Sequence, residues 1–363
     1  MKKNKNYVDL KDQPVPEGQH LLEVDDLKMY FHTEDGVVRA VDGVSYTLDR
    51  GETLGVVGES GSGKSVTAMT IMGLISMPPG KIEGGDVRYR GRSILEMTEE
   101  EMQHIRGNDI AMIFQDPMTS LNPVYKIGKQ VGEGLRLHRG YSKQEALKRA
   151  TELLDLVGIP EPEKRVNEYP HQFSGGMRQR VMIAMALACD PDILIADEPT
   201  TALDVTIQAQ IIELMQEMQE KNGNAIIMIT HDLGVVADMA DKIMVMYAGR
   251  PVEFGTAEEI FYESRHPYTW GLIRSIPEQA IDEKKPLTPI HGNPPSLMNL
   301  PEGCVFSPRC PYATDKCRKQ RPERVVTESG HYSACHYSGD PEFLKNAPET
   351  SRTRTDSKKG GEA

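Results

Sequence analysis

The run Gly58–Ser65, GESGSGKS, has the residue types and spacing of a phosphate-binding loop. An apolar run at 53–57 precedes it and an apolar helical pattern at 65–75 follows it, as that motif requires. In such a loop consecutive backbone N–H groups and the start of the helix bind phosphate oxygens, the lysine reaches the β- and γ-phosphates, and the serine ligates Mg²⁺. A chance glycine turn would not need that order of strand, loop and helix. The candidate nucleotide-binding residues here are Gly58, Ser60, Gly61, Gly63, Lys64, Ser65 and Val66.

Two carboxylates end a second apolar run. Residues 193–196 are ILIA, and Asp197 and Glu198 follow them. A carboxylate at the end of a buried strand beside a phosphate-binding loop can hold Mg²⁺, and its neighbour can activate water for attack on the γ-phosphate. Read alone, Asp-Glu after a strand is most often a solvated turn. Together with the loop at 58–65 it is typical of a Walker B motif, with Asp197 as metal ligand and Glu198 as general base.

The run Ser174-Gly175-Gly176 is, as a bare motif, a helix N-cap followed by glycines. It lies shortly before the apolar run at 193–196, and with that placement the chain resembles the ATPase subunits of ATP-binding cassette (ABC) transporters. In that family this signature contacts the γ-phosphate held by the opposite subunit. The resemblance therefore implies two ATPase subunits that meet face to face. Phe173 and Met177 depart from the commonest Leu-Ser-Gly-Gly-Gln form, but the contacts fall on the serine and glycines, so we expect an active site.

The same resemblance assigns roles to four further positions. Gln115, after the apolar run at 110–114, matches the glutamine that senses Mg²⁺ and the attacking water, so it joins Ser65 and Asp197 as an expected Mg²⁺ ligand. Asp204 in Ala-Leu-Asp matches the residue that couples the two sites, and His231 matches the histidine that contacts the γ-phosphate. Phe31, or failing it Tyr30, matches the aromatic residue that stacks on adenine. Each of these residues alone would be read as solvated or as packing, and only their order and spacing favour the functional interpretation.

The elements that must position these residues predict an α/β P-loop ATPase fold. Apolar alternation at 21–48, punctuated by Asp-Gly at 35–36 and 42–43, indicates a small antiparallel sheet with tight turns. Short apolar runs at 53–57, 193–196 and 225–230 indicate a buried parallel sheet, with a helix at 205–221. Residues 116–180 read as a helical insertion, including a helix that Ser142 and Glu145 begin with a capping box.

The domain boundaries follow from composition. We expect a polar leader at 1–20, the ATPase domain at 21–265 with its helical subdomain at about 116–180, a proline-rich, cysteine-bearing extension at 266–341, and a disordered tail at 342–363.

The extension carries four of the five cysteines, Cys304, Cys310, Cys317 and Cys335, separated by five, six and seventeen residues. Structural zinc sites and common ferredoxin runs are more tightly spaced, so neither template fits. The resemblance implies a [4Fe–4S] cluster on these four cysteines, with zinc as the runner-up, and four reduced, partly buried thiols are the alternative. Cys189, inside the apolar run 181–189, is expected in the core.

Composition excludes several classes. The chain has 363 residues, 38% of them hydrophobic, and a net charge of −12 without a basic block, so nucleic acid is not expected as a partner. The longest apolar run has nine residues, against roughly 18 to 20 for a membrane-spanning helix. The N-terminus has lysines but no apolar stretch behind them, which predicts a protein that stays in the cytoplasm.

The branch of the family is indicated by the run 114–123, FQDPMTSLNP, by HPYT at 266–269 and by the cysteine-bearing end. These resemble the oligopeptide and dipeptide uptake branch, which implies an ATP- and Mg²⁺-dependent ATPase at the cytoplasmic face of the membrane. The implied partners are a second, different ATPase subunit, two membrane permease subunits and, indirectly, an extracytoplasmic substrate-binding protein. A nickel or other small-solute importer of the same branch, and a soluble mechanical or regulatory ABC ATPase, are the alternatives.

Overall fold

The computed structural model describes residues 10–11, 13–200, 205–276 and 289–348. It divides into two compact units, residues 1–251 with 295–300, and residues 252–294 with 301–363. The first unit holds the described nucleotide-site candidates, and the second holds the four clustered cysteines. In the described ranges, no helix combines the length and apolar character that crossing a membrane requires.

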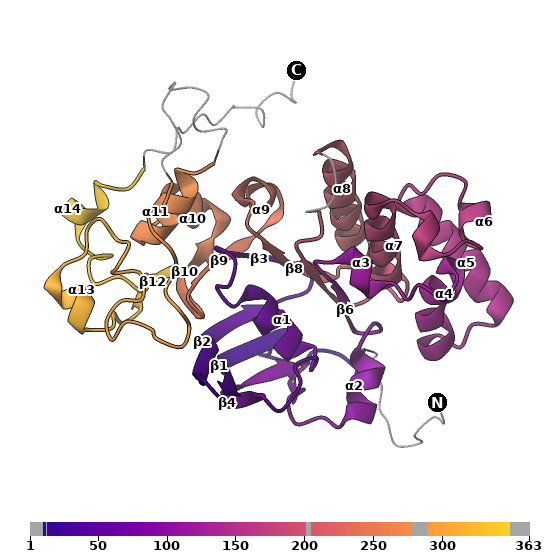
Figure 1. Cartoon of the computed structure of the whole chain (residues 1–363), viewed down its shortest axis with the longest axis horizontal. Helices are drawn as coiled ribbons and strands as arrows, with labels where there is room; N and C mark the ends of the chain where they lie inside the picture. The colour runs from indigo at the N-terminus through magenta and orange to yellow at the C-terminus, as the bar shows by residue number, and fades with distance from the viewer. Residues whose placement is uncertain (1–9, 12, 201–204, 277–288, 349–363) are drawn as a thin grey trace. The chain divides into compact units, whose positions relative to one another are not determined.

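The first unit contains an antiparallel sheet (Figure 1). Its strands, in the order β2-β1-β4-β5, are β1 (Leu22–Thr33), β2 (Gly36–Leu48), β4 (Gly80–Tyr89) and β5 (Arg92–Ser93). A turn joins β1 to β2 beside Gly36, as expected. Asp42 and Gly43, in contrast, lie inside β2: the register with β1 shifts there and Gly43 has a φ of +89°. The expected second turn is therefore wrong, because a bulge absorbs the left-handed glycine without reversing the chain.

A parallel sheet forms the rest of the nucleotide-binding core. Its strands, in the order β9-β3-β8-β7-β6, are β3 (Thr53–Val57), β6 (Ile110–Ile113), β7 (Ile193–Asp197), β8 (Ala225–Thr230) and β9 (Lys242–Tyr247). Every residue of β3, β6, β7 and β8 is buried, as continuous apolar runs predict. Because parallel strands end at the same edge, the loops after β3, β7 and β8 meet there.

Helices connect these strands. They are α1 (Lys64–Ile71), α2 (Glu99–Ile105), α8 (Val205–Asn222) and α9 (Leu233–Met239). Helix α1 contacts β1, β2 and β7, so it joins the two sheets within the first unit (Figure 1). It ends four residues before the expected limit at 75, and Gly73 has a φ of +60°. The predicted α/β P-loop architecture is confirmed by these elements.

The helical insertion lies beside β6 (Figure 1), and its apolar side chains share one buried cluster with residues of β6, β7, β8 and α8. It comprises α3 (Pro117–Ser120), α4 (Ile127–His138), α5 (Lys143–Leu156), α6 (Pro162–Arg165), a 3₁₀ turn (Pro170–Gln172) and α7 (Gly175–Leu187). Helices α4, α5 and α7 pack on one another. The capping box of α5 is confirmed: Ser142 Oγ accepts from the Glu145 N–H, and Glu145 accepts from the Ser142 N–H. This packing fixes the direction of α7, which begins at the signature.

The carboxyl end of α7 is held by two cations. Lys11 Nζ donates to the carbonyl oxygen of Cys189 at 3.1 Å and also to that of Asp190, and Arg139 donates to the Cys189 oxygen at 2.5 Å. Positive charge at this end of a helix complements its dipole. Leu10, beside Lys11, is 4% exposed. Leu10 therefore belongs to the packed core.

The second unit contains β10 (Arg250–Thr256, from Val252 onward), β12 and β11, paired antiparallel in that order. The other elements are α10 (Ala257–Tyr262), α11 (Pro267–Ile273), α13 (Asp315–Lys319), β11 (Val325–Val326), β12 (Tyr332–Ser333) and α14 (Pro341–Leu344). Glu253 is fully buried, its carboxylate 3.0 Å from Nε2 of His331. Trp270 is 1% exposed and packs on Tyr312 and Phe343. The short elements are thus held by a small aromatic core.

Candidate functional site

A cavity of about 260 Å³ opens at the carboxyl edge of the parallel sheet. Its polar lining comes from the phosphate-binding loop and the start of α1. Its apolar lining comes from β1, β2 and a segment of the C-terminal extension. The lining residues are Phe31, Val38, Ala40, Ser60, Gly61, Ser62, Gly63, Lys64, Ser65, Val66, Gln115, Glu198 and Leu297. Most of the residues expected to bind nucleotide therefore share one cavity.

Lys64 is folded back onto its own loop. Its side chain is buried, and Nζ donates to the carbonyl oxygens of Gly58 at 2.6 Å and Glu59 at 3.0 Å. Burial lowers the pKa of Lys64, and the nearby carboxylates of Glu198 and Asp197 oppose that shift. An ammonium group held this way is close to any phosphate that the loop accepts.

The loop is locked in place by close backbone approach. A Cβ on Gly63, whose φ is +101°, would lie 2.3 Å from the carbonyl oxygen of Ala40. A Cβ on Gly249, whose φ is +80°, would lie 2.5 Å from the carbonyl oxygen of Arg39. The Gly249 N–H donates to the Ser62 oxygen at 2.9 Å. The phosphate-binding loop, β2 and the turn after β9 are therefore in direct main-chain contact.

Ser65 and Asp197 form the candidate magnesium site. Ser65 Oγ donates to Asp197 Oδ1 at 3.0 Å, and Asp197 is 2% exposed. Burial raises the pKa of the Asp197 carboxyl, although the hydrogen bond from Ser65 opposes the shift. A hydroxyl and a carboxylate side by side are hard oxygen donors of the kind that Mg²⁺ accepts, and a divalent cation would compensate the buried negative charge. The residues present fit the metal.

Glu198 stands at the centre of the candidate catalytic group. Its Oε2 accepts from Nε2 of Gln115 at 2.9 Å, and its Oε1 lies 3.3 Å from Nδ1 of His231. Its backbone has a φ of +47°, a left-handed conformation uncommon outside glycine, while its N–H donates to the Ile229 oxygen at 2.8 Å. The end of β7, the end of β8 and the loop after β6 thus bring the three predicted groups together, and two of them, Gln115 and Glu198, line the cavity.

The signature residues lie elsewhere in this chain. Ser174 caps α7, its Oγ accepting from the Met177 N–H at 3.3 Å. Ser174 and Gly175 are exposed, and neither lines the cavity. This placement agrees with a role toward the nucleotide of another subunit. Asp204 lies outside the described residues.

The two aromatic candidates are separated by the structure. Phe31 lines the cavity, while Tyr30 donates its hydroxyl to Asp42 at 2.8 Å. Burial and this hydrogen bond raise the pKa of Tyr30 to about 12. Sequence reasoning did not name Val38, Ala40 and Leu297, because no local motif marks a lining residue. Ser62, also unnamed although it is inside the loop motif, has a buried Oγ without a hydrogen-bond partner in the described chain.

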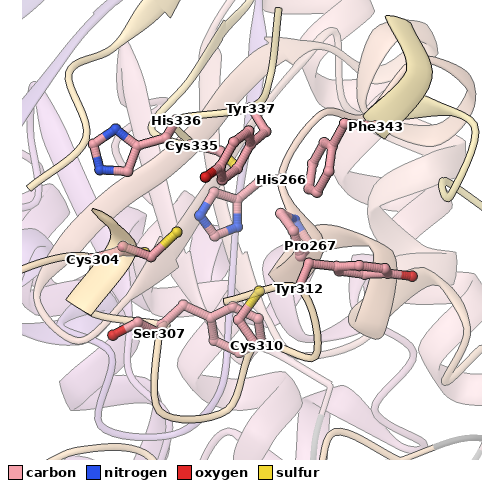
Figure 2. A pocket seen from close by; sticks show the side chains of 12 residues that line it. His266, Pro267, Cys304, Ser307, Cys310, Tyr312, Cys335, His336, Tyr337 and Phe343 are labelled. Carbon is pink, nitrogen blue, oxygen red and sulfur yellow. The ribbon is translucent and has the colours of Figure 1, made fainter. Parts of the chain in front are cut away.

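The four clustered cysteines line a second cavity, inside the second unit (Figure 2). The sulfurs of Cys304 and Cys310 point into the space between them. Burial raises the pKa of Cys310 to about 11 and that of Cys335 to about 12. Among the residues that the structure describes, no group of three or more His, Cys, Asp or Glu side chains is placed to hold a single metal ion.

Comparisons with known proteins agree with this geometry. The model of the ABC transporter family matches residues 41–201, and that of the oligopeptide/dipeptide transporter C-terminal region matches residues 252–317. The dimeric ATP-binding cassette MJ0796, solved in a post-hydrolysis state with ADP and Pi, superposes with a TM-score of 0.60 at 29% identity, covering 65% of this chain and 98% of that one. The fold and the site define an ABC-type ATPase, an enzyme that hydrolyses ATP.

Curated relatives indicate the branch of ABC-type ATPases to which the chain belongs. The oligopeptide transport ATP-binding protein OppD of Bacillus subtilis (strain 168) is 58% identical, over 86% of this chain and 87% of the relative. The dipeptide transport ATP-binding protein DppD of Escherichia coli (strain K12) is 52% identical, over 88% of this chain and 97% of the relative. This chain belongs to the family of oligopeptide and dipeptide transport ATP-binding proteins.

Proposed function

We propose that this protein hydrolyses ATP to energise the import of oligopeptides or dipeptides through a membrane ABC transporter. The observation that carries the hydrolytic part is Glu198, which lines the phosphate-binding cavity and lies within hydrogen-bonding distance of Gln115 and His231. The substrate class is supported by the match of residues 252–317 to the oligopeptide/dipeptide transporter region and by the names of the relatives.

The catalytic roles follow from the positions of the side chains. The loop N–H groups and Lys64 bind the phosphates. Ser65 and Asp197 would hold Mg²⁺, which would supply neutralisation of phosphate charge. Glu198 accepts a proton from the attacking water. Gln115 and His231, both within hydrogen-bonding reach of its carboxylate, orient that carboxylate and the water. Phe31 stacks on adenine, which its place in the cavity supports.

The partners are proposed from the family and from exposed surface. A second ATPase subunit, different from this one, would place its nucleotide against Ser174, Gly175 and Gly176. Asp204 would couple the nucleotide sites of the two subunits. Two membrane permease subunits would contact the helical insertion, where Met118 and Val124 are 59% and 70% exposed, and large exposed apolar side chains mark interaction sites when they gather. An extracytoplasmic binding protein would act indirectly, and the ATPase would sit at the cytoplasmic face of the membrane.

Uptake in cells tests the transport function. Cells that lack the gene are complemented with the wild type, with Glu198→Gln, or with Glu34→Gln, a change of the same kind at an exposed turn. We expect labelled tripeptide uptake to return with the wild type and Glu34→Gln only. If cells that lack the gene took up the peptide normally but no longer took up nickel, the result would support a nickel importer instead. Copurification without permease subunits and no uptake defect would favour a soluble ATPase.

For the second unit we propose a [4Fe–4S] cluster on Cys304, Cys310, Cys317 and Cys335, with zinc as the runner-up. The support is a donor set of four thiols around one cavity. A cubane cluster binds each thiolate at a different iron, so its ligands are more widely spread than those of one zinc ion. Binding must displace thiol protons, since burial raises the pKa of Cys310 and Cys335.

Metal and sulfide analysis after anaerobic purification separates the alternatives. Iron and acid-labile sulfide with broad visible absorbance, lost in Cys310→Ser, would support the cluster. Stoichiometric zinc in a colourless protein would support the runner-up. A metal-free protein with four titratable thiols would support the third alternative, in which the cysteines are reduced, partly buried thiols.

A further inference from the structure

A short piece of the C-terminal extension reaches the nucleotide cavity. Residues 295–300 group with the first unit, although the residues before and after them in the chain group with the second. Leu297, in this segment, is half-buried and lines the cavity together with Phe31 and Val38. The match to the ABC transporter family ends at residue 201. The contact therefore comes from a part of the chain outside the common ATPase motifs.

The segment is fastened to the edge of the antiparallel sheet. Strand β2 is the outer strand, and the Arg39 N–H donates to the carbonyl oxygen of Leu297 at 3.2 Å. An edge strand presents unpaired N–H groups, so this bond satisfies one of them and sets the position of Leu297. Met298 Cε lies 3.1 Å from the point where a Cβ of Gly36 would be. Leu297 is thus held against β2 in two ways: its carbonyl oxygen is hydrogen-bonded to Arg39, and the side chain of the next residue, Met298, packs at Gly36.

The lining of the cavity contains two kinds of surface. The phosphate-binding loop, Lys64 and Ser65 suit phosphates, whereas Phe31, Val38, Ala40 and Leu297 are apolar. Phe31 and Val38 are register partners of β1 and β2, and Leu297 is hydrogen-bonded to Arg39, next to Val38, so these three lie near one another. A purine base has apolar faces and needs a surface of this kind, whereas a phosphate does not. Leu297 is consequently placed toward the base of a bound nucleotide.

We propose that Leu297 packs against the adenine base of ATP, and that the C-terminal extension thereby contributes directly to nucleotide affinity. The inference rests on the proposed function, because it takes ATP as the occupant. The contact is hydrophobic, so it acts on the base and not on the phosphates. The extension is thus a component of the nucleotide site, in addition to any role in its own unit.

Binding to two ligands tests this contact in the full chain. Kd values for ATP and for inorganic tripolyphosphate, which has no base, are measured by titration calorimetry for the wild type, Leu297→Ala and Leu300→Ala. Leu300 is half-buried in the same segment but does not line the cavity. We expect Leu297→Ala to weaken ATP binding roughly threefold to tenfold, with tripolyphosphate binding unchanged and Leu300→Ala equal to the wild type. Phe31→Ala is measured as a reference, because it removes another apolar side chain of the same lining and should also lower the affinity for ATP.

Three outcomes would overturn the inference. Equal ATP affinity of Leu297→Ala and the wild type would show that the leucine only packs on β2. An equal loss for ATP and tripolyphosphate would place the effect in the phosphate cradle. A similar loss in Leu300→Ala would assign it to loosening of the segment. In each of these cases ATP hydrolysis by the wild type would still stand, whereas a wild type that binds neither ligand would overturn the proposed function as well.

Discussion

Ser65 Oγ donates a hydrogen bond of 3.0 Å to Asp197 Oδ1 and so joins the start of α1 to the end of β7. The two residues are far apart in the chain, yet the parallel sheet brings the ends of β3 and β7 to one edge. Their oxygens are the proposed magnesium ligands next to Glu198. One hydrogen bond therefore links the proposed phosphate-binding residues to the proposed catalytic carboxylate.

Replacing Glu198 with Gln separates binding from hydrolysis. The amide keeps the size of the side chain but cannot take a proton, so we expect turnover to fall by roughly 10² to 10⁴ while ATP still binds. Phosphate release and ATP affinity are measured on the same preparation. Unchanged hydrolysis in this variant would refute the general-base assignment.

The change Gly175→Ala tests whether the site is shared between subunits. No atom lies within 4 Å of the added Cβ in this chain, and an exposed glycine at a helix start tolerates alanine. We expect the free energy of unfolding to stay within about 1 kcal/mol of the wild-type value, while ATPase activity of the assembled pair falls roughly 10- to 100-fold. Full activity after this change would mean that no partner nucleotide contacts the signature.

Asp192 is a test of buried charge. It is 5% exposed, accepts from the Tyr89 hydroxyl at 2.6 Å, and pairs with Arg90, whose side chain is 3% exposed. Asp192→Ala leaves that buried guanidinium without its carboxylate, with hydrogen bonds only to the Tyr89 hydroxyl and the Gln13 carbonyl oxygen among those seen in the described residues, so urea unfolding should show a loss of about 3 to 5 kcal/mol. The control is Glu152→Gln, which removes an exposed pair with Arg149 and should cost less than about 1 kcal/mol. Equal losses would contradict the argument.

Glu259 makes the second unit sensitive to acid. Although burial alone would raise the pKa of Glu259, hydrogen bonds from Ser329 and Thr256 outweigh burial and lower it. An acid whose folded pKa lies below its unfolded value stabilises the fold above the unfolded pKa and loses that contribution as pH falls. Unfolding is followed from pH 7 to pH 3 by fluorescence of Trp270, the single tryptophan, which lies in the same unit. Glu259→Gln should reduce the pH dependence, and an identical profile would contradict this assignment.

The sequence predicted the parts of the fold that local patterns determine. The run Ala225–Thr230 matches β8 to the residue, and the capping box begins α5 where Ser142 indicated. Local patterns failed where distant contacts decide. Asp-Gly at 42–43 is a strong turn signal, yet Asp42 is buried and pairs with Arg250, so the chain continues as a strand with a bulge.

The same limit applies to the site. Walker-type residues are recognisable because each motif carries its own chemistry at fixed spacing. Leu297 has no such signal, since its position depends on one bond from Arg39, distant in the chain. The cysteines gave a count and a spacing, and only the folded second unit shows that all four line one cavity.

The main-chain contact among Gly63, Gly249 and β2 affects how mutations in this gene would be classified by their phenotype. Gly249 belongs to none of the nucleotide motifs, but a side chain there would press on the carbonyl oxygen of Arg39 and displace the strand that supports the phosphate-binding loop. A missense change at Gly249 would consequently copy the phenotype of a mutation in the phosphate-binding loop. In a screen for loss of uptake, it would be scored with the ATP-binding mutants although it lies far from that loop in the sequence.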